Sequence, residues 1–342
     1  MFEHRFCTPN FFLKEIDYIK IRKIIESGWV SIGENVDELE SLFKKRFNVK
    51  YAIGCSSATS GLVISLKSAN FKDMKIAVPS FTWPSTLYAI ESNSGNSPIF
   101  CDVNKETWLI ELPQSFEEYD AVLAVDIFGN QENVNNRISC PIIFDAAHGF
   151  DLPNLGKRGI AEVVSLSFTK NVTGMEGGVI LTNDDFFAET AIELRRLSGR
   201  MGEINAYITL KSIEYYDNEY KLMKEEIINK YRSKFDFNFV EQKTESYSNN
   251  SVYSILFEDQ NIRNSVANEL NNNGIESKIY YEPLKSGFKN TDYIYSKILS
   301  LPIHPNVLDF QDKLIDIINK TVNEHKYVPG KNYMIKTGFL KK

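Results

Sequence analysis

The residue of this chain that is best placed to do chemistry is Lys170, in the segment SLSFTKNVTGMEGG at residues 165–178. The segment predicts a short apolar strand that enters a glycine-containing turn. A lysine amine held at the end of a buried strand and partly desolvated can lose its proton near neutral pH. The neutral amine can then attack an aldehyde and form a Schiff base. Most lysines are solvated surface charges, so other segments must support this hypothesis.

A second segment, PIIFDAAHG at residues 141–149, places an acid at the end of an apolar run. The run predicts a buried parallel strand, and open α/β sheets bind ligands at the carboxyl ends of such strands. An enzyme that uses the aldehyde pyridoxal 5'-phosphate (PLP) needs an acid there to keep the pyridine nitrogen of the cofactor protonated. Asp145 fits that role, and its alternative role is that of a helix cap or turn residue.

A third segment, YAIGCSSATSGLVISL at residues 51–66, predicts a strand, a turn of small residues and an amphipathic helix. Exposed backbone amides at a helix N-terminus, the positive end of the helix dipole and nearby hydroxyl groups suit a phosphate dianion. Ser57, Ala58 and Thr59 are the candidate ligands. The junction carries neither nucleotide-binding fingerprint, Gly-Lys-Ser/Thr or Gly-x-Gly-x-x-Gly. The alternative is an ordinary Ser/Thr helix cap.

A fourth segment, VPSFTWPST at residues 78–86, places an indole at the start of a helix. The face of Trp83 can stack on a planar cofactor ring, where dispersion and cation–π attraction contribute on the order of 0.5 to 2 kcal/mol. The alternative role of Trp83 is core packing or a hydrophobic staple at the helix entry.

Taken together and in this order, the four segments resemble the DegT/DnrJ-type family of nucleotide-sugar aminotransferases, which are PLP-dependent enzymes of fold type I. The resemblance covers nearly the whole chain. It also includes shorter stretches at residues 25–33, 200–206, 279–284 and 301–305. It implies a fold type I transferase with a smaller C-terminal α+β domain.

By this resemblance, Lys170 binds PLP as a Schiff base, is displaced by the amino donor, and then moves a proton between the donor carbon and the cofactor. The cofactor cycles through pyridoxamine 5'-phosphate (PMP). Asp145 pairs with the pyridine nitrogen and makes the ring an electron sink. His148 stands where the family has glutamine or histidine, and it is expected near the 3-hydroxyl group of the cofactor. The alternative for His148 is a capped loop histidine.

The resemblance also completes the phosphate site. Ser165 is expected to join the residues of the third segment in holding the phosphate, and Trp83 to cover the ring. Family members usually carry a Gly-x-Asn-x-Arg-Met stretch whose asparagine, or a neighbouring residue, reaches the phosphate in the other subunit. Here the stretch at residues 197–201 has Ser198 at the asparagine position, so Arg200 becomes the candidate ligand across the subunit boundary. A homodimer is therefore expected.

The reaction that the resemblance implies is transfer of an amino group from L-glutamate to a keto group on a nucleotide-linked deoxysugar. The best single substrate is dTDP-4-keto-6-deoxyglucose, aminated at C-4, for surface polysaccharide or glycan biosynthesis such as the O-antigen of lipopolysaccharide. Amination at C-3 and sugars linked to UDP or GDP stay open. Trp29, Tyr280 and Tyr281 are the candidate substrate contacts. Aromatic packing under the small domain is the alternative for the two tyrosines.

Three other functions share this fold. A PLP-dependent sugar dehydratase replaces the Schiff-base lysine with histidine, whereas Lys170 is intact. A catalytically inactive regulatory homologue is expected to lose Lys170 or Asp145, and both are present. An ordinary amino-acid aminotransferase normally offers an arginine to the substrate carboxylate late in the chain, and no arginine follows Arg263.

Composition agrees with this hypothesis. A hydrophobic content of 43% and a charged content of 25% are typical of globular proteins. The net charge of -6 argues against a general nucleic-acid or membrane surface, because each needs a basic patch. The four cysteines show no Cys-x-x-Cys spacing and predict reduced thiols, so no metal site is expected. No stretch approaches the ~20 apolar residues of a membrane helix, and residues 1–13 carry charges, so a cytoplasmic location is expected.

The elements that position these residues alternate along the first half of the chain, which predicts a mostly parallel sheet flanked by helices. Helices are predicted at 13–27 and 35–47. Strands are predicted at 75–78, 97–101, 121–126, 141–144, 163–167 and 178–181.

The second half predicts a smaller unit. After Glu203, apolar residues recur at helical spacing for about thirty residues. Beyond a polar loop at 242–251, strands are predicted at 252–257 and 275–280, and helices at 260–272 and 309–325. At 342 residues the chain exceeds one ordinary core. We predict a large PLP-binding α/β domain over residues 1–235 and a small α+β domain over 236–342, with a basic tail from 326.

Overall fold

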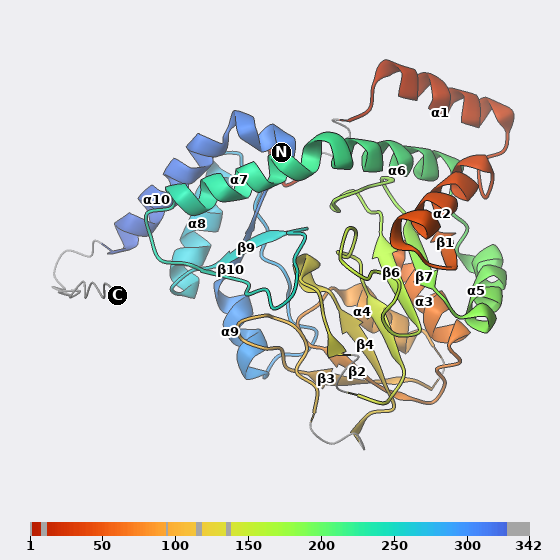
Figure 1. Cartoon of the computed structure of the whole chain (residues 1–342). Coiled ribbons are helices and arrows are strands. Elements are labelled where there is room, and N and C mark those ends of the chain that lie inside the picture. Colours follow the sequence, from red (N-terminus) through yellow and green to blue (C-terminus); the bar gives the residue numbers. More distant parts are fainter. Residues whose placement is uncertain (1, 8–11, 94, 114–117, 135–137, 327–342) are drawn as a thin grey trace.

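The computed structural model describes residues 2–7, 12–93, 95–113, 118–134 and 138–326, which form a large and a small α/β unit (Figure 1). The large unit contains a seven-stranded sheet and the small unit a three-stranded sheet. In this described part of the chain, none of the helices has both the length and the apolar character that crossing a membrane requires.

The large sheet has the strand order β1-β7-β6-β5-β4-β2-β3. Neighbouring strands from β3 to β6 run parallel, and β7 is antiparallel to both of its neighbours, β6 and β1. The prediction of a mostly parallel sheet is therefore confirmed. Its strands are β1 (Tyr51–Cys55), β2 (Lys75–Pro79), β3 (Ser97–Cys101), β4 (Ala121–Val125), β5 (Ile142–Asp145), β6 (Ala161–Ser165) and β7 (Gly178–Thr182).

Helices cover both faces of the large sheet because its strands are apolar on both sides. Along β6 and β7, successive side chains point to opposite faces, so Val163 and Ile180 join one core while Val164 and Val179 join the other. One face packs against α3 (Ala58–Ser68), α4 (Pro84–Glu91) and α5 (Asp185–Ser198). The other packs against α2 (Glu34–Phe47) and α6 (Glu203–Tyr215).

One long helical segment links the two units (Figure 1). It begins as α6, passes through a π-helical turn, η4 (Tyr216–Tyr220), and continues as α7 (Lys221–Lys234). The predicted helix of about thirty residues after Glu203 is thus confirmed, whereas the π-helical turn was not predicted. Such turns insert one residue into a helix and are frequent near functional sites.

The small unit folds around α7 and an antiparallel sheet of order β10-β9-β8. Its core joins apolar residues of the sheet with those of α7, α8 and the closing helix. Its elements are β8 (Val240–Glu241), β9 (Tyr253–Leu256), α8 (Gln260–Asn272), α9 (Lys289–Lys297), β10 (Ile298–Leu301), the 3-10 turn η5 (Pro305–Asp309) and α10 (Gln311–Lys326).

The predicted strand at residues 275–280 is wrong. This segment makes only isolated bridges, from Ile275 to His4 and from Lys278 to Ser300. Its backbone hydrogen bonds are divided among α8, the N-terminal segment and β10, so no continuous ladder forms. The elements α9 and β10 were not predicted, and the basic tail beyond residue 326 lies outside the described residues. The domain boundary near residue 235 stays a prediction.

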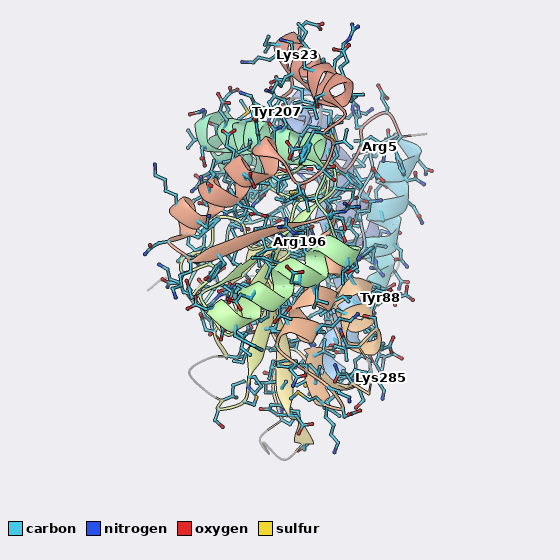
Figure 2. The ribbon with its side chains drawn as sticks, turned by 90° about the vertical axis from the view of Figure 1, so that its right-hand side faces the viewer. Arg5, Lys23, Tyr88, Arg196, Tyr207 and Lys285 are labelled. Carbon is cyan, nitrogen blue, oxygen red and sulfur yellow. The ribbon has the colours of Figure 1, made fainter. Side chains whose placement is uncertain are left out.

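Helix α1 (Glu15–Ser27) stands apart from the sheets, across α6 (Figures 1 and 2). Asp17 anchors it, because its carboxylate accepts hydrogen bonds from the Tyr207 hydroxyl at 2.7 Å and from the Lys14 backbone at 2.8 Å. Several apolar side chains of this helix and the following loop are exposed: Ile16, Tyr18, Ile19, Ile25, Trp29 and Val30. An exposed apolar group of this kind typically marks a contact with another protein surface.

Candidate active site

A cavity of about 320 Å³ lies where the large sheet meets the small unit. Its walls come from the carboxyl ends of β5 and β6, the N-termini of α3 and α4, and segments of the small unit. Ten of the predicted site residues line it: Ser57, Ala58, Thr59, Trp83, Asp145, His148, Ser165, Lys170, Tyr280 and Tyr281.

Lys170 lies in the turn that follows β6, and its backbone amide donates to the Ser167 carbonyl at 3.1 Å. Its Nζ atom lies 2.9 Å from Nε2 of His148. Desolvation lowers the pKa of Lys170 to about 8, against the opposing charges of Asp145 and Cys7. A sizeable fraction of the amine is therefore neutral near pH 7.5, which is the form that attacks an aldehyde.

Asp145 is the last residue of β5 and is only 4% exposed. Its carboxylate accepts hydrogen bonds from the Thr86 hydroxyl at 2.7 Å and from the Ala147 amide at 3.1 Å. Burial raises the pKa of Asp145, while these two hydrogen bonds and the charge of Lys170 oppose the rise. A buried carboxyl group in this position suits a cationic ring nitrogen.

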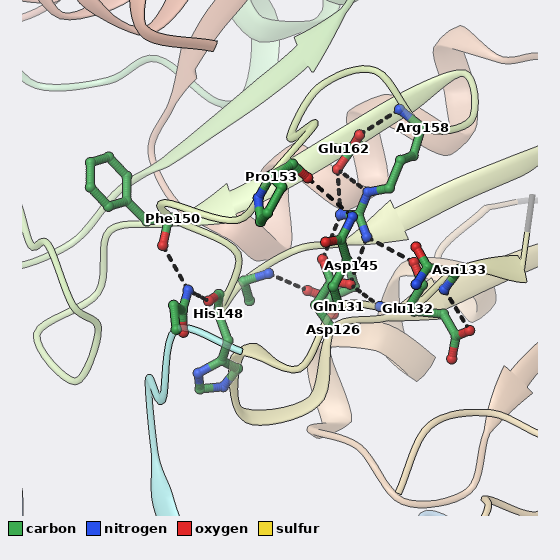
Figure 3. Close-up of polar contacts among 12 residues, drawn as sticks. Asp126, Gln131, Glu132, Asn133, Asp145, His148, Phe150, Pro153, Arg158 and Glu162 are labelled. Carbon is green, nitrogen blue, oxygen red and sulfur yellow. Dashed lines mark hydrogen bonds and ion pairs between the residues drawn. The ribbon is translucent and has the colours of Figure 1, made fainter. Parts of the chain in front are cut away.

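A buried ion cluster lies next to Asp145 (Figure 3). Arg158 pairs with Asp126 at 2.7 Å and with Glu162 at 2.5 Å, and both carboxylates are fully buried. The Asp126 amide donates to the Asp145 carbonyl at 3.1 Å. The cluster thus ties the end of β4 to β5 and β6 and fixes the strand end that carries the acid.

His148 is buried and connects three segments. Its Nε2 atom lies 2.9 Å from Lys170 Nζ and 2.8 Å from the Tyr281 hydroxyl, and its Nδ1 atom lies 2.9 Å from the Ser251 hydroxyl. Desolvation and the charge of Lys170 hold the pKa of His148 well below its usual value, so the ring is neutral. Burial raises the pKa of Tyr281, which keeps its O–H as a donor.

The N-terminus of α3 forms a seat with the features that a phosphate group needs. The hydroxyl of Ser57 caps the helix by accepting from the Ser60 amide at 3.0 Å, and Thr59 donates to Ser85 at 2.9 Å. Gly178 of β7 permits this arrangement, because the Cβ atom of any other residue there would lie only 2.7 Å from the Ala58 amide nitrogen. The helix end can therefore lie directly against the sheet, with its amides facing the cavity.

Aromatic rings form one wall of the cavity. The ring centroids of Trp83 and Tyr281 lie 5.8 Å apart, and those of Tyr280 and Tyr281 lie 5.0 Å apart. Phe6 packs edge-on against Tyr280 at 5.9 Å. Trp83 is 53% exposed, so its indole has free surface that can cover a ring or a substrate.

Two predicted site residues do not line this cavity. Arg200 forms an isolated bridge with Cys55, next to the phosphate turn, but its side chain is exposed. Trp29 is 66% exposed, and its indole donates to the Ile32 carbonyl at 3.1 Å. Within a single chain, neither residue is brought to the other ten.

Sequence reasoning missed Thr86, Ser85, Ser251 and Phe6. Thr86 and Ser85 belong to the segment of Trp83, and their hydroxyl groups in the first turn of a helix were an available signal. Ser251 and Phe6 come from segments that carry no motif, and only the fold brings Ser251 to the imidazole of His148 and Phe6 to the cavity wall.

The cavity therefore joins an amine of lowered pKa, a buried acid, a neutral imidazole and a helix N-terminus. These groups fit the aldehyde, ring nitrogen, ring hydroxyl and phosphate of PLP. Lys170 would hold the aldehyde carbon, Asp145 the ring nitrogen, and the α3 N-terminus the phosphate.

Comparisons with known proteins point the same way. The model of the DegT/DnrJ/EryC1/StrS aminotransferase family matches residues 13–320. An uncharacterised protein of Methanocaldococcus jannaschii is 25% identical over 88% of this chain and 94% of its own length.

Solved structures share the fold. The GDP-4-keto-6-deoxy-D-mannose-3-dehydratase of E. coli with bound hydrated PLP superposes with a TM-score of 0.80, at 18% identity over 93% of this chain and 100% of its own. NtdA of Bacillus subtilis with bound PMP superposes with a TM-score of 0.81, at 19% identity over 92% of this chain and 84% of its own.

Proposed function

The chain belongs to the DegT/DnrJ/EryC1/StrS aminotransferase family of PLP-dependent enzymes, and we propose that it transfers an amino group from L-glutamate to a nucleotide-linked keto-deoxysugar. The observation that carries the proposal is the contact of Lys170 with His148 at 2.9 Å in the cavity that also contains Asp145. An amine, an acid and a neutral imidazole in one cavity are the groups that this transfer needs.

The residues of the chain divide the work. PLP supplies an electron sink for charge that develops at the α-carbon of the donor. Lys170, with a pKa of about 8, can hold or release a proton at neutral pH and so can move one to and from that carbon. Asp145 would place negative charge opposite the ring nitrogen, and His148 would present a neutral nitrogen to the ring hydroxyl. The aromatic wall excludes water on one side.

The substrate that we propose is dTDP-4-keto-6-deoxyglucose, aminated at C-4 for a surface polysaccharide such as O-antigen. The exposed face of Trp83 and the half-buried ring of Tyr280 line the cavity and support a sugar, because sugar rings pack on aromatic faces through their C–H groups. Amination at C-3 and sugars on UDP or GDP are the alternatives that a substrate panel decides.

Lys170 favours amino transfer over sugar dehydration. A fold-level relative, the E. coli enzyme above, is named as a dehydratase. A positioned amine can take a proton from the donor carbon, deliver one to the former keto carbon of the acceptor, and bind the aldehyde of the cofactor again, whereas a residue without an amine cannot bind that aldehyde. The intact amine, held in the cavity, therefore supports a complete transamination cycle.

Two half-reactions test this function in one cuvette. We expect the visible absorbance of the PLP Schiff base to disappear when L-glutamate is added and to return when dTDP-4-keto-6-deoxyglucose follows. The matched control is dTDP-glucose, which has no keto group and should leave the absorbance low. Loss without return rejects this sugar and directs the panel to other nucleotides and 3-keto sugars. If no Schiff-base absorbance forms with PLP, the proposed function is wrong.

The charges of the cavity support a second subunit. Among the described residues that line it, Lys170 is the only lysine or arginine, while Asp145 and Glu176 are acids. A phosphate dianion and a nucleotide diphosphate need further cations. Arg200 lies exposed beside the phosphate turn, and the exposed apolar residues of α1 suit a subunit contact.

We therefore expect Arg200→Ala to weaken PLP binding by roughly 10- to 100-fold, the range for loss of one charge-assisted hydrogen bond of about 1.5–3 kcal/mol. Arg196→Ala, which removes an exposed arginine paired with Glu193, is the control. Mixing Arg200→Ala with Lys170→Ala subunits shows where Arg200 acts. If it acts across a dimer, the mixed dimer has one complete site and regains activity. A mixture that stays inactive, or an active monomer in light scattering, contradicts this placement.

A further inference from the structure

Lys224 of α7 is a buried cation that the proposed reaction does not use. It is 2% exposed and does not line the cofactor cavity. Lysine is seldom buried to this extent unless its amine has specific partners. It lies in the first turn of α7, just after the π-helical turn, on the face of α7 that also carries the buried Ile227, Ile228 and Tyr231.

The partners of Lys224 come from two distant segments. Its Nζ atom donates to the side-chain oxygen of Asn171 at 3.1 Å and to the backbone carbonyl of Asn249 at 2.5 Å. The amine also lies 5.4 Å from the ring centroid of Tyr216 and 5.8 Å from that of Tyr220. Tyr216 and Tyr220 are the first and last residues of the π-helical turn, so the turn shapes the pocket that holds the amine.

The first contact acts on the turn of the nucleophile. Asn171 follows Lys170 directly and is 5% exposed. Its side-chain nitrogen has no hydrogen-bond partner among the described residues, so the bond from Lys224 is the one that orients the amide. Loss of that bond leaves the buried amide without an anchor beside the reacting lysine.

The second contact acts on the segment behind His148. The side chain of Asn249 donates to the carbonyls of His148 at 2.7 Å and Phe150 at 2.6 Å, contacts that Figure 3 shows at these two labelled residues. Ser251, two residues further on, contacts the imidazole. Gly129 packs against the Asn249 side chain, and a Cβ atom at this position would lie 1.8 Å from the Asn249 side-chain oxygen.

From these contacts we propose that Lys224 is a positioning residue that ties the turn of Lys170 to the segment that holds His148. In this way it keeps the Lys170 amine in its desolvated place 2.9 Å from the imidazole. The consequence for catalysis rests on the proposed function, whereas the geometric link does not.

The charges around Lys224 do not weaken this link. Desolvation lowers its pKa to about 7, with Asp151 and Glu225 opposing the shift and Lys221 adding to it. A neutral amine still has two N–H groups, which are enough for Asn171 and Asn249. Lys224 can therefore keep both hydrogen bonds above and below pH 7.

The test measures the reactivity of the Lys170 amine in the protein without added cofactor. Trace labelling with acetic anhydride across pH, followed by mass spectrometry of the Lys170 peptide, gives the pH midpoint of its reactivity. Lys224→Met removes the amine and keeps an unbranched apolar chain. Lys230→Met, on the same helix but half-exposed and paired with Asp312, is the matched control.

We expect Lys224→Met to raise the labelling midpoint of Lys170 from about 8 toward the ordinary 10.5, because a loosened turn admits water to the amine. Each unit of this shift lowers the labelling at pH 7 about tenfold. Lys230→Met should leave the midpoint unchanged. A purely structural role for Lys224 would lower the melting temperature without moving the midpoint.

A folded Lys224→Met protein with the wild-type midpoint overturns the proposal. If that variant does not fold, Asn171→Ala decides, since it removes only the contact next to Lys170: a raised midpoint supports the proposal and an unchanged one overturns it. Failure of the proposed function is seen separately, as wild-type protein that carries PLP but does not complete the two half-reactions.

Discussion

Lys170→Ala is expected to fold normally, to form no Schiff base with PLP, and to lose turnover by at least about 10³-fold, because in the proposed function this one side chain is both nucleophile and proton carrier. Its amine lies 2.9 Å from Nε2 of His148. Visible absorbance with PLP and steady-state turnover measure the two losses, and circular dichroism checks the fold. Lys67→Ala, which removes an exposed lysine of α3, should behave as wild type. Full turnover by Lys170→Ala would overturn the site.

The lowered pKa of Lys170 adds a pH dependence to the same experiment. The amine is protonated and inactive below its pKa of about 8 and neutral and nucleophilic above it. The rate of Schiff-base formation in the wild type should therefore rise with pH, reach half its maximum near pH 8, and level off above. A rise centred near the ordinary lysine value of 10.5 would show that the amine is not desolvated.

Asp145→Asn is expected to lower turnover by about 10²- to 10³-fold, the typical cost of removing one preorganised electrostatic partner from an active site. The amide keeps the shape of the carboxylate and cannot place negative charge opposite the ring nitrogen. Schiff-base formation should persist, since Lys170 is intact. The measurement is the rate of the glutamate half-reaction followed by absorbance.

Thr86→Val provides a graded companion to that variant. It keeps the Asp145 carboxylate and removes the hydrogen bond at 2.7 Å. Because this bond opposes the effect of burial, its loss should raise the pKa of Asp145 further and cause a smaller decrease in turnover than Asp145→Asn. A glutamate half-reaction that is unchanged in Asp145→Asn would show that this carboxylate does not pair with the ring nitrogen.

Much of the fold could be predicted because its signals are local. The run at 141–144 is apolar at every position, and it became β5 (Ile142–Asp145) in a parallel sheet. The helix predicted at 260–272 has the bounds of α8, since Asp259 caps it and its apolar residues have helical spacing. The strand prediction for 275–280 was wrong because this segment pairs with His4 and Ser300, which are distant in sequence and are brought to it only by the fold.

The sequence by itself determined which residues are candidates for the chemistry. Asp145 ends one strand, and Lys170 and the Ser57–Thr59 segment follow two others, each with a distinct pattern. Strand ends that point the same way meet at one edge of the sheet, so the meeting of these residues follows from topology. Only the tertiary structure decided how these groups are tuned and held. The pKa of Lys170 depends on burial by distant segments, and the imidazole of His148 is held by Ser251 and Tyr281. Lys224 contacts Asn171 and Asn249, which lie 53 and 25 positions away in the sequence. Such contacts leave no periodicity in a sequence, because desolvation and hydrogen bonding depend on distance in space alone.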